Sequence, residues 1–212
     1  MFKDCTSITE INLSNFDSSK VKSMDNMFEG CSSLTSIDLS NLKTSSVKRM
    51  IFMFSGCSSL TSLNISHFDT SSVTRMDSMF SHCSSLTSLN LSNFDFLSAT
   101  SIDTMFCGCS NLYTIELPNS ITKIEPSTFS YSGLYSIILP DSLTSIGVSA
   151  FYHCSNLEEI ELPYDDTAPR PRQRVLERRE RKEAELAKKK REKAREKAAR
   201  AAEADGFLRE DF

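Results

Sequence analysis

Pairs of apolar residues recur at a fixed interval along the first half of the chain. Met-Phe occurs at Met1-Phe2, Met27-Phe28, Met53-Phe54, Met79-Phe80 and Met105-Phe106, always 26 residues apart. A fixed period in this range is typical of a solenoid, in which each unit buries its apolar side only by stacking on its neighbours. The pattern therefore predicts a stack of coils.

Three further apolar columns follow each Met-Phe pair in an L-x-x-L-x-L arrangement. They are Ile8, Leu34, Leu60, Leu86, Leu112, Leu134 and Leu157; Ile11, Ile37, Leu63, Leu89, Ile115, Ile137 and Ile160; and Leu13, Leu39, Ile65, Leu91, Leu117, Leu139 and Leu162. This arrangement predicts a short strand in each coil with alternate side chains inward. Stacked coils would pair these strands in parallel, about 4.8 Å apart.

The remaining columns close each coil. Phe16, Leu42, Phe68 and Phe94 are expected to fill a corner, and each Met-Phe segment is expected to form a short helical turn. After residue 110 the unit shortens to 22 or 23 residues, as measured between Phe106, Phe129 and Phe151. The prolines of the shorter unit come just after a strand, where they end its pairing.

These motifs resemble a known family. The 26-residue unit, M-F-x-x-C-S-S-L-T-S-L-N-L-S-N-F, resembles the BspA-type (Treponema-pallidum-like) leucine-rich repeats, and L-P-x-S-L-T-S-I-G-x-x-A-F-x-x-C at 139–154 is similar to a second variant of that family. The resemblance implies an α/β solenoid, a right-handed leucine-rich repeat superhelix of about seven coils with a parallel sheet. It also implies a surface-exposed or secreted protein that adheres to host or matrix proteins.

Charge divides the chain into two parts. Residues 1–164 carry 8 Lys/Arg and 16 Asp/Glu, whereas residues 165–212 carry 16 and 12. We expect a solenoid over 1–164, a linker over 165–172, a charged helical tail over 173–204 and a flexible C-terminus over 205–212. The tail has the Ala, Glu, Lys and Arg composition of a helix, and it lacks the heptad seam of a coiled coil.

The chain shows no targeting segment that would decide its location. Met1 lies directly on a repeat boundary with no recognisable signal peptide, and no run of 18 apolar residues predicts a transmembrane segment. An intracellular location and a fragment of a longer chain therefore stay open beside the cell surface.

Reactive side chains do not form a catalytic or metal-binding pattern. Cys5, Cys31, Cys57, Cys83 and Cys109 follow the repeat, which favours a ladder of buried, reduced thiols over disulfides or metal ligands. We interpret His67, His82 and His153 as lone histidines on the surface or at corners, without a shared ligand set. We find no nucleophile elbow, phosphate loop or paired carboxylates, so we predict no enzymatic activity, no cofactor and no metal.

The outward positions of the strands are the first candidate for partner binding. Solenoids commonly bind proteins on such an extended face, and Tyr113, Tyr131, Tyr135 and Tyr152 gather in the last coils. We therefore predict a non-catalytic scaffold for protein–protein interaction, of which a surface adhesin is one form. Its partner-binding residues would be Tyr113, Glu116, Tyr135, Ile138, Glu159 and Glu161. The alternative is a solvated face without a ligand.

The basic tail and the open first coil are two further candidates. Lys188, Lys189, Lys190, Arg191, Lys193 and Arg195 could bind nucleic acid, an anionic membrane surface or an import receptor, against the simpler alternative of a solvated helix. The first coil presents an uncapped apolar face and an open strand edge, which predicts self-association unless more coils precede it.

Overall fold

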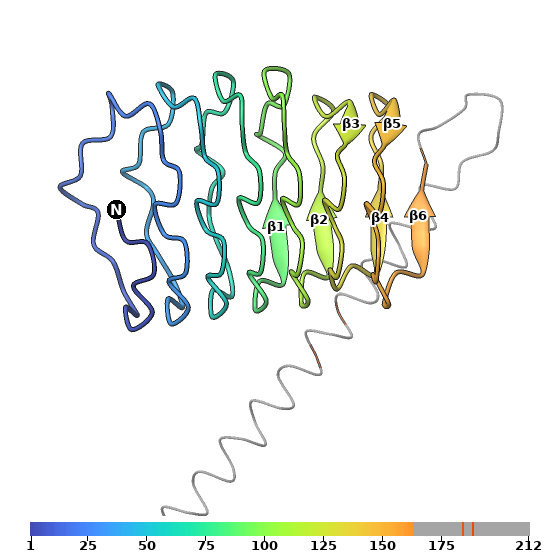
Figure 1. The fold of residues 1–212 in the computed structure, drawn as a ribbon, viewed down its shortest axis with the longest axis horizontal. Helices are drawn as coiled ribbons and strands as arrows, with labels where there is room; N and C mark the ends of the chain where they lie inside the picture. Colours follow the sequence, from blue (N-terminus) through green and yellow to red (C-terminus); the bar gives the residue numbers. More distant parts are fainter. Residues whose placement is uncertain (163–183, 185–187, 189–212) are drawn as a thin grey trace, which may run out of the picture. The chain divides into compact units, whose positions relative to one another are not determined.

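The computed structural model describes residues 1–162, Ala184 and Lys188, and the chain divides into two compact units, Met1–Asp165 and Asp166–Phe212. In the first unit the chain winds through coils that stand side by side (Figure 1). The predicted solenoid with parallel strands is confirmed. Ala184 and Lys188 are exposed and have helical backbone, and the rest of the predicted charged helix lies outside the described residues.

Two sets of short parallel strands connect the later coils. The first set comprises β1 (Ser88–Asn90), β2 (Thr114–Glu116), β4 (Ser136–Ile138) and β6 (Glu159–Glu161). β1 pairs with β2 and β4 with β6, and β2 lies against β4. The second set, β3 (Lys123–Ile124) and β5 (Ser145–Ile146), forms a separate parallel pair.

The prediction of a strand in every coil is wrong for the first three coils. Residues 10–12, 36–38 and 62–64 form no strand. In these coils the side-chain oxygens of Asn12, Asp38 and Asn64 each accept a hydrogen bond from the amide two residues later. β1 has the same Ser-Leu-Asn sequence as residues 62–64, and its Asn90 makes the same bond, so these bonds do not exclude a strand. What distinguishes β1 is its partner β2, in which β-branched residues favour a ladder.

The strands β3 and β5 were not among the predicted elements. They lie in the Leu-Pro units, where a second run of alternating residues follows the proline turn at Ile121–Ile124 and at Leu143–Ile146. Ile and Thr in these runs favour extended backbone, which is the signal that sequence reasoning missed.

The Met-Phe segments form a run of turns rather than the expected short helical turn. Alternate amides donate to the next coil, from Asn26 to Ile51 O at 2.8 Å, from Phe28 to Met53 O at 2.9 Å and from Gly30 to Ser55 O at 2.7 Å. The amides between them bond within the coil, three residues back. The φ angles of Asn26 and Gly30 are +60° and +71°, so each segment needs two left-handed residues. We call this pairing the turn ladder.

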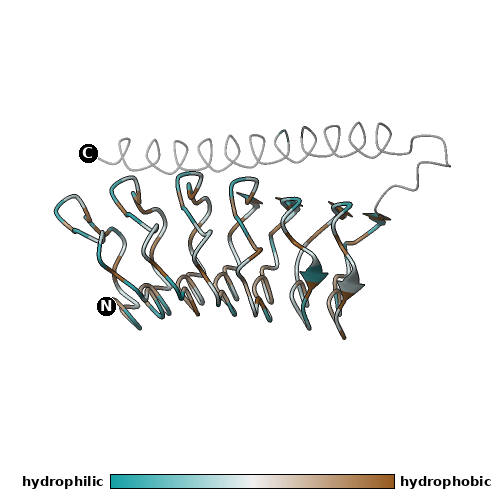
Figure 2. Ribbon diagram, turned by 90° about the horizontal axis from the view of Figure 1, so that it is seen from above, coloured by the Kyte–Doolittle hydropathy of each residue, from teal (hydrophilic) through white to brown (hydrophobic). Residues whose placement is uncertain are grey.

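A column of stacked phenylalanines follows the turn ladder through the core. Ring centroids of successive residues lie 5.3–5.8 Å apart, from Phe2 through Phe28, Phe54, Phe80, Phe106 and Phe129 to Phe151. Phe28, Phe54, Phe80, Phe106 and Phe129 are at most 1% exposed. The stack continues where the unit shortens, so the change of period leaves the core in register. Apolar and polar positions alternate along each coil in Figure 2.

The cysteine column is a ladder of free thiols, and the thiols bond as well as fill space. Each Sγ of Cys31, Cys57, Cys83, Cys109 and Cys154 donates to a phenylalanine carbonyl of the preceding coil, at 2.9–3.2 Å. All seven cysteines are free. Burial raises the pKa of Cys57 and of Cys109 to about 12. The inner thiols therefore keep their protons and are poor nucleophiles.

Buried threonine hydroxyl groups form a second set of hydrogen bonds between the coils. Thr70 Oγ1 accepts from the amide of Asp95 at 2.8 Å and donates to its carbonyl at 3.1 Å, and Thr44 makes the same pair of bonds to Asp69. Phe96 interrupts this column and packs beside Phe94, with ring centroids 5.9 Å apart. The Phe96 amide donates a hydrogen bond to Ser120 Oγ at 3.1 Å.

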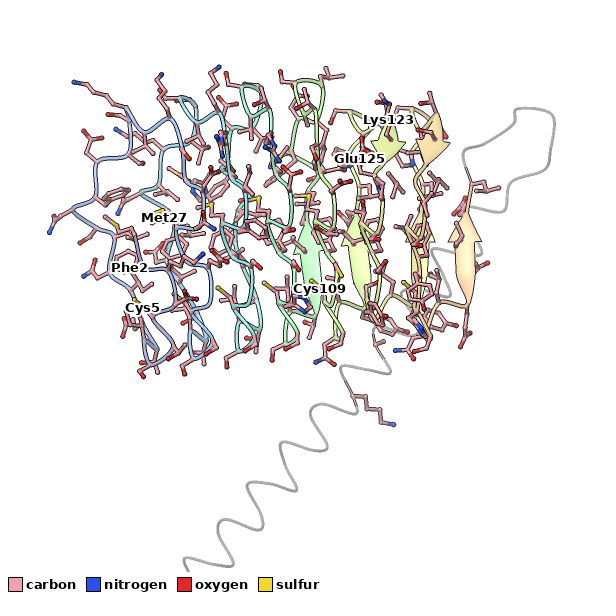
Figure 3. All side chains as sticks on the ribbon, in the orientation of Figure 1. Phe2, Cys5, Met27, Cys109, Lys123 and Glu125 are labelled. Atoms are coloured by element: carbon pink, nitrogen blue, oxygen red, sulfur yellow. The ribbon has the colours of Figure 1, made fainter. Side chains whose placement is uncertain are left out.

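The two ends of the described stack are less buried than its centre. At the last coil, Ile160 is 40% and Leu162 is 64% exposed, because no described coil packs against their outer side. Both had been expected to point inward. At the first coil, Phe2 and Cys5 are half-buried, and Figure 3 shows both at that end, near Met27.

We expect Phe54→Ala to lower the free energy of unfolding by about 3–5 kcal/mol, because the substitution removes a fully buried ring from the stack. Denaturation in urea measures this loss. The matched control is Phe52→Asn, two residues away at a 38% exposed position. Equal losses for the two variants would contradict the assigned core.

We expect alkaline pH to destabilise the fold through the buried thiols. The raised pKa of Cys57 means that the folded protein keeps a proton that the unfolded chain releases above about pH 9. Stability is therefore retained below that pH and falls between about pH 9 and 12, by about 1.4 kcal/mol per pH unit for each such thiol. Urea titrations across this range should give a shallower pH dependence for Cys57→Ser. An unchanged slope would refute the assignment.

Candidate interaction surface

Two tyrosines stack beside the first set of strands. Tyr113 and Tyr135 immediately precede β2 and β4, and their rings are parallel with centroids 5.4 Å apart. The amide of Tyr135 donates to Tyr113 O at 3.2 Å, and its hydroxyl donates to Glu158 Oε2 at 2.6 Å. The structure thus brings these two predicted residues together, with a carboxylate from the next coil.

A second aromatic group, the tyrosine cluster, consists of Tyr131, Tyr152 and His153. The Tyr131 ring lies 5.6 Å from that of Tyr152 and stacks on that of His153 at 5.0 Å. Both tyrosines are 52% exposed. The amide of Tyr131 donates to Tyr152 O at 2.8 Å as part of the turn ladder. His153, predicted to be a lone histidine, is therefore part of an exposed aromatic surface.

The tyrosine cluster places rings at a left-handed backbone position where several other coils have glycine. Tyr131 and His153 have φ angles of +59° and +56° at the position that Gly30, Gly56 and Gly108 occupy in other coils, and His82 occupies the same position at +58°. A bulky side chain at a left-handed position costs of order 1 kcal/mol, and such strain concentrates at functional sites. The repeat alignment carried this signal, because aromatic residues replace glycine in that column.

The other predicted partner-binding residues differ in exposure. Glu116 is exposed, Ile138 and Glu159 are half-buried, and Glu161 is buried. Ile138 faces Glu161 across the β4–β6 pair. The expectation of a uniformly exposed strand face is wrong, because Thr114 and Ser136 are buried too. A partner would therefore meet a narrower surface than the strand alternation predicts.

The charge of the later coils is strongly acidic. Residues 81–162 contain one cation, Lys123, and eight Asp/Glu. Lys123 begins β3 and Glu125 directly follows this strand, and Figure 3 labels both residues. Both line a cavity of about 410 Å³, together with Phe96, Ile102 and Ile121. The lining contains no histidine or cysteine.

The described residues contain no group of three or more His, Cys, Asp or Glu side chains that could hold a metal ion. The His67 ring already has a hydrogen-bond partner, because its Nε2 lies 2.9 Å from Leu39 O. In this part of the chain no helix has the length and apolar character needed to cross a membrane. Lys188 of the basic tail is exposed, and Lys189, Lys190, Arg191, Lys193 and Arg195 lie outside the described residues, so the tail site stays a prediction.

Residues 1–117 match the family described as "Mycoplasma protein of unknown function, DUF285", and residues 77–168 match the "BspA type Leucine rich repeat region". The chain belongs to the DUF285 family and carries BspA-type leucine-rich repeats. The predicted resemblance is therefore confirmed, and the solenoid is a leucine-rich repeat solenoid. No curated protein matches the chain.

Two solved structures resemble this leucine-rich repeat chain. One is a leucine rich cell surface protein from Faecalibacterium prausnitzii A2-165, with 32% sequence identity and a TM-score of 0.54, over 74% of this chain and 37% of that protein. The other is a leucine-rich repeat protein from Bacteroides ovatus ATCC 8483, with 22% identity and a TM-score of 0.39, over 76% and 62%. The chain thus spans little more than a third of the first relative's length.

Proposed function

We propose that this chain is a non-catalytic protein-interaction module that binds a protein partner through its last described coils, in the manner of a cell-surface adhesin. The observation that carries the proposal is the exposed tyrosine cluster on a rigid solenoid. The family supports an interaction role in general, and the description of one relative as a cell surface protein supports the surface location.

The chemistry of the tyrosine cluster suits protein recognition. Tyrosine is enriched at binding hot spots because a rigid ring buries much apolar area while its hydroxyl makes a hydrogen bond. Tyr131 and Tyr152 already have fixed backbones in the turn ladder, so a partner would pay little entropy to order them. The tyrosines at 113 and 135, with Glu116, Ile138, Glu159 and Glu161, would border this hot spot.

The test replaces the tyrosines with residues that the repeat itself uses. Tyr131→Gly introduces the residue of Gly30 and Gly56, and Tyr152→Ser introduces that of Ser55 and Ser81. We expect the double variant to fold normally and to bind about 30-fold more weakly, since a hot spot contributes 2 kcal/mol or more. Binding of the full chain to purified extracellular-matrix proteins, immobilised for surface plasmon resonance, measures the change.

The control for this experiment is Leu97→Ser, which removes a 74% exposed apolar side chain from an earlier coil. It should bind like the unmodified chain. If the double tyrosine variant binds every matrix ligand as tightly as the control does, the proposed surface is wrong.

A further inference from the structure

The first coils carry rows of exposed cations in the segments that follow the buried Thr44 and Thr70 in the sequence. The backbones of Ser23, Arg49, Arg75 and Ser101 are bridged in parallel from coil to coil. In the adjacent row, the Lys48 amide donates to Lys22 O at 2.8 Å. Lys22 and Lys48 are exposed, and the side chains of Arg49 and Arg75 are 52% and 49% exposed. The rows align these cations along the solenoid axis.

Two carboxylates orient the arginines. Arg49 Nη2 lies 2.7 Å from Asp25 Oδ2, and Asp25 Oδ1 accepts from the amide of Ile51 at 2.9 Å. Arg75 Nε donates to Asp77 Oδ2 at 3.0 Å, and Asp77 also accepts from Ser101. Exposed ion pairs add little stability. Their effect here is to hold each guanidinium in place while its other N–H groups remain available as donors.

One aromatic residue breaks the repeat within this surface. Where other coils have Asn26, Ser78 or Thr104, this coil has Phe52, with a φ angle of +56° and 38% of its surface exposed. A left-handed phenylalanine is strained, and an exposed ring gains little from burial. The Phe52 amide donates to Asp77 O at 3.0 Å, so the Phe52 backbone lies beside the residue whose carboxylate holds Arg75.

Charge is also unevenly distributed along the described solenoid. Of the eight Lys/Arg within residues 1–162, seven lie in residues 1–80, where eight Asp/Glu accompany them, whereas residues 81–162 have one cation beside eight Asp/Glu. We use the name cation row for the surface that the cations of these rows form together with the phenylalanine. It consists of Lys22, Lys48, Arg49, Phe52 and Arg75.

We propose that the cation row binds an acidic polysaccharide, that is, a linear polymer of sugars that bear carboxylate or sulfate groups. Lysine and arginine would pair with the anionic groups, and the Phe52 ring would pack on the C–H face of a sugar. The carboxylates of Asp25 and Asp77 would accept hydrogen bonds from sugar hydroxyls. Rows that repeat at about 4.8 Å suit an extended polymer rather than a compact ligand.

The mixture of charges favours a glycan over a nucleic acid. A nucleic acid carries a phosphate at every nucleotide, and Asp25 and Asp77 lie among the cations, where they would repel neighbouring phosphates. A polysaccharide alternates anionic groups with neutral hydroxyls, which can use both the carboxylates and the guanidinium groups.

The test measures binding of the full chain to heparin, hyaluronate, neutral dextran and single-stranded DNA by isothermal titration calorimetry. The first two probes distinguish sulfate from carboxylate recognition. We expect binding to at least one of them, weakened by salt, and no binding to dextran. Phe52→Asn should reduce the affinity about tenfold and leave the melting temperature unchanged or higher, because asparagine tolerates a positive φ angle. Lys22→Gln with Lys48→Gln should weaken binding and flatten its salt dependence.

The controls are Leu97→Asn, for an exposed apolar residue, and Lys123→Gln, for a cation elsewhere; both should bind normally. Failure to bind either acidic glycan would overturn the proposal. Glycan binding that Phe52→Asn and the double lysine variant leave intact would place the interaction elsewhere in the chain and refute this site. If single-stranded DNA binds through these residues more tightly than either glycan, the ligand class is wrong.

Discussion

The turn ladder is the interaction on which the rest of this structure depends. It fixes the distance and register between coils, because alternate amides of each Met-Phe segment bond only to the next coil. That register places each phenylalanine ring on the ring of the preceding coil and each inner thiol within reach of a phenylalanine carbonyl. The strands are secondary by comparison, since the first coils stack without them.

The same constraint decides which positions are free to acquire function. Each turn segment requires two left-handed residues, which the repeat mostly supplies as glycine or as small polar residues such as Asn26, Ser78 and Thr104. Phe52, His82, Tyr131 and His153 occupy such positions with bulky rings. Each proposed surface includes such residues, Tyr131 and His153 in the last coils and Phe52 in the first, whereas His82 belongs to neither. The core columns hold the coils together, whereas the ring-bearing residues at the left-handed turn positions point their side chains outward.

The sequence predicted the solenoid, its core columns and the family, because a repeat in register fixes burial in every unit at once. Phe28, Phe54 and Phe80 could be assigned to the core from period alone. The strand pairing could not be derived in this way, since residues 62–64 and 88–90 share the sequence Ser-Leu-Asn and only the second segment forms a strand. The left-handed turns were also missed, although Gly30, Gly56 and Gly108 recur in one column.

Sites were harder to predict than the core. The sequence placed Tyr113 and Tyr135 in the last coils, but their stacking, the burial of Glu161 and the contact of His153 with Tyr131 depend on how neighbouring coils meet. The alternation of inward and outward side chains along a strand could not predict these features, because that pattern describes one coil at a time.

Residue-resolved hydrogen exchange measured by NMR tests the central role of the turn ladder most directly. The amides of Phe28, Phe54 and Phe80 donate between coils and should exchange slowly, with free energies of opening that approach the global stability. The amides of Ile11 and Ile37, in segments without a strand ladder, should exchange faster. The opposite order, with slow exchange at Ile11 and Ile37 and fast exchange at the phenylalanines, would contradict this account.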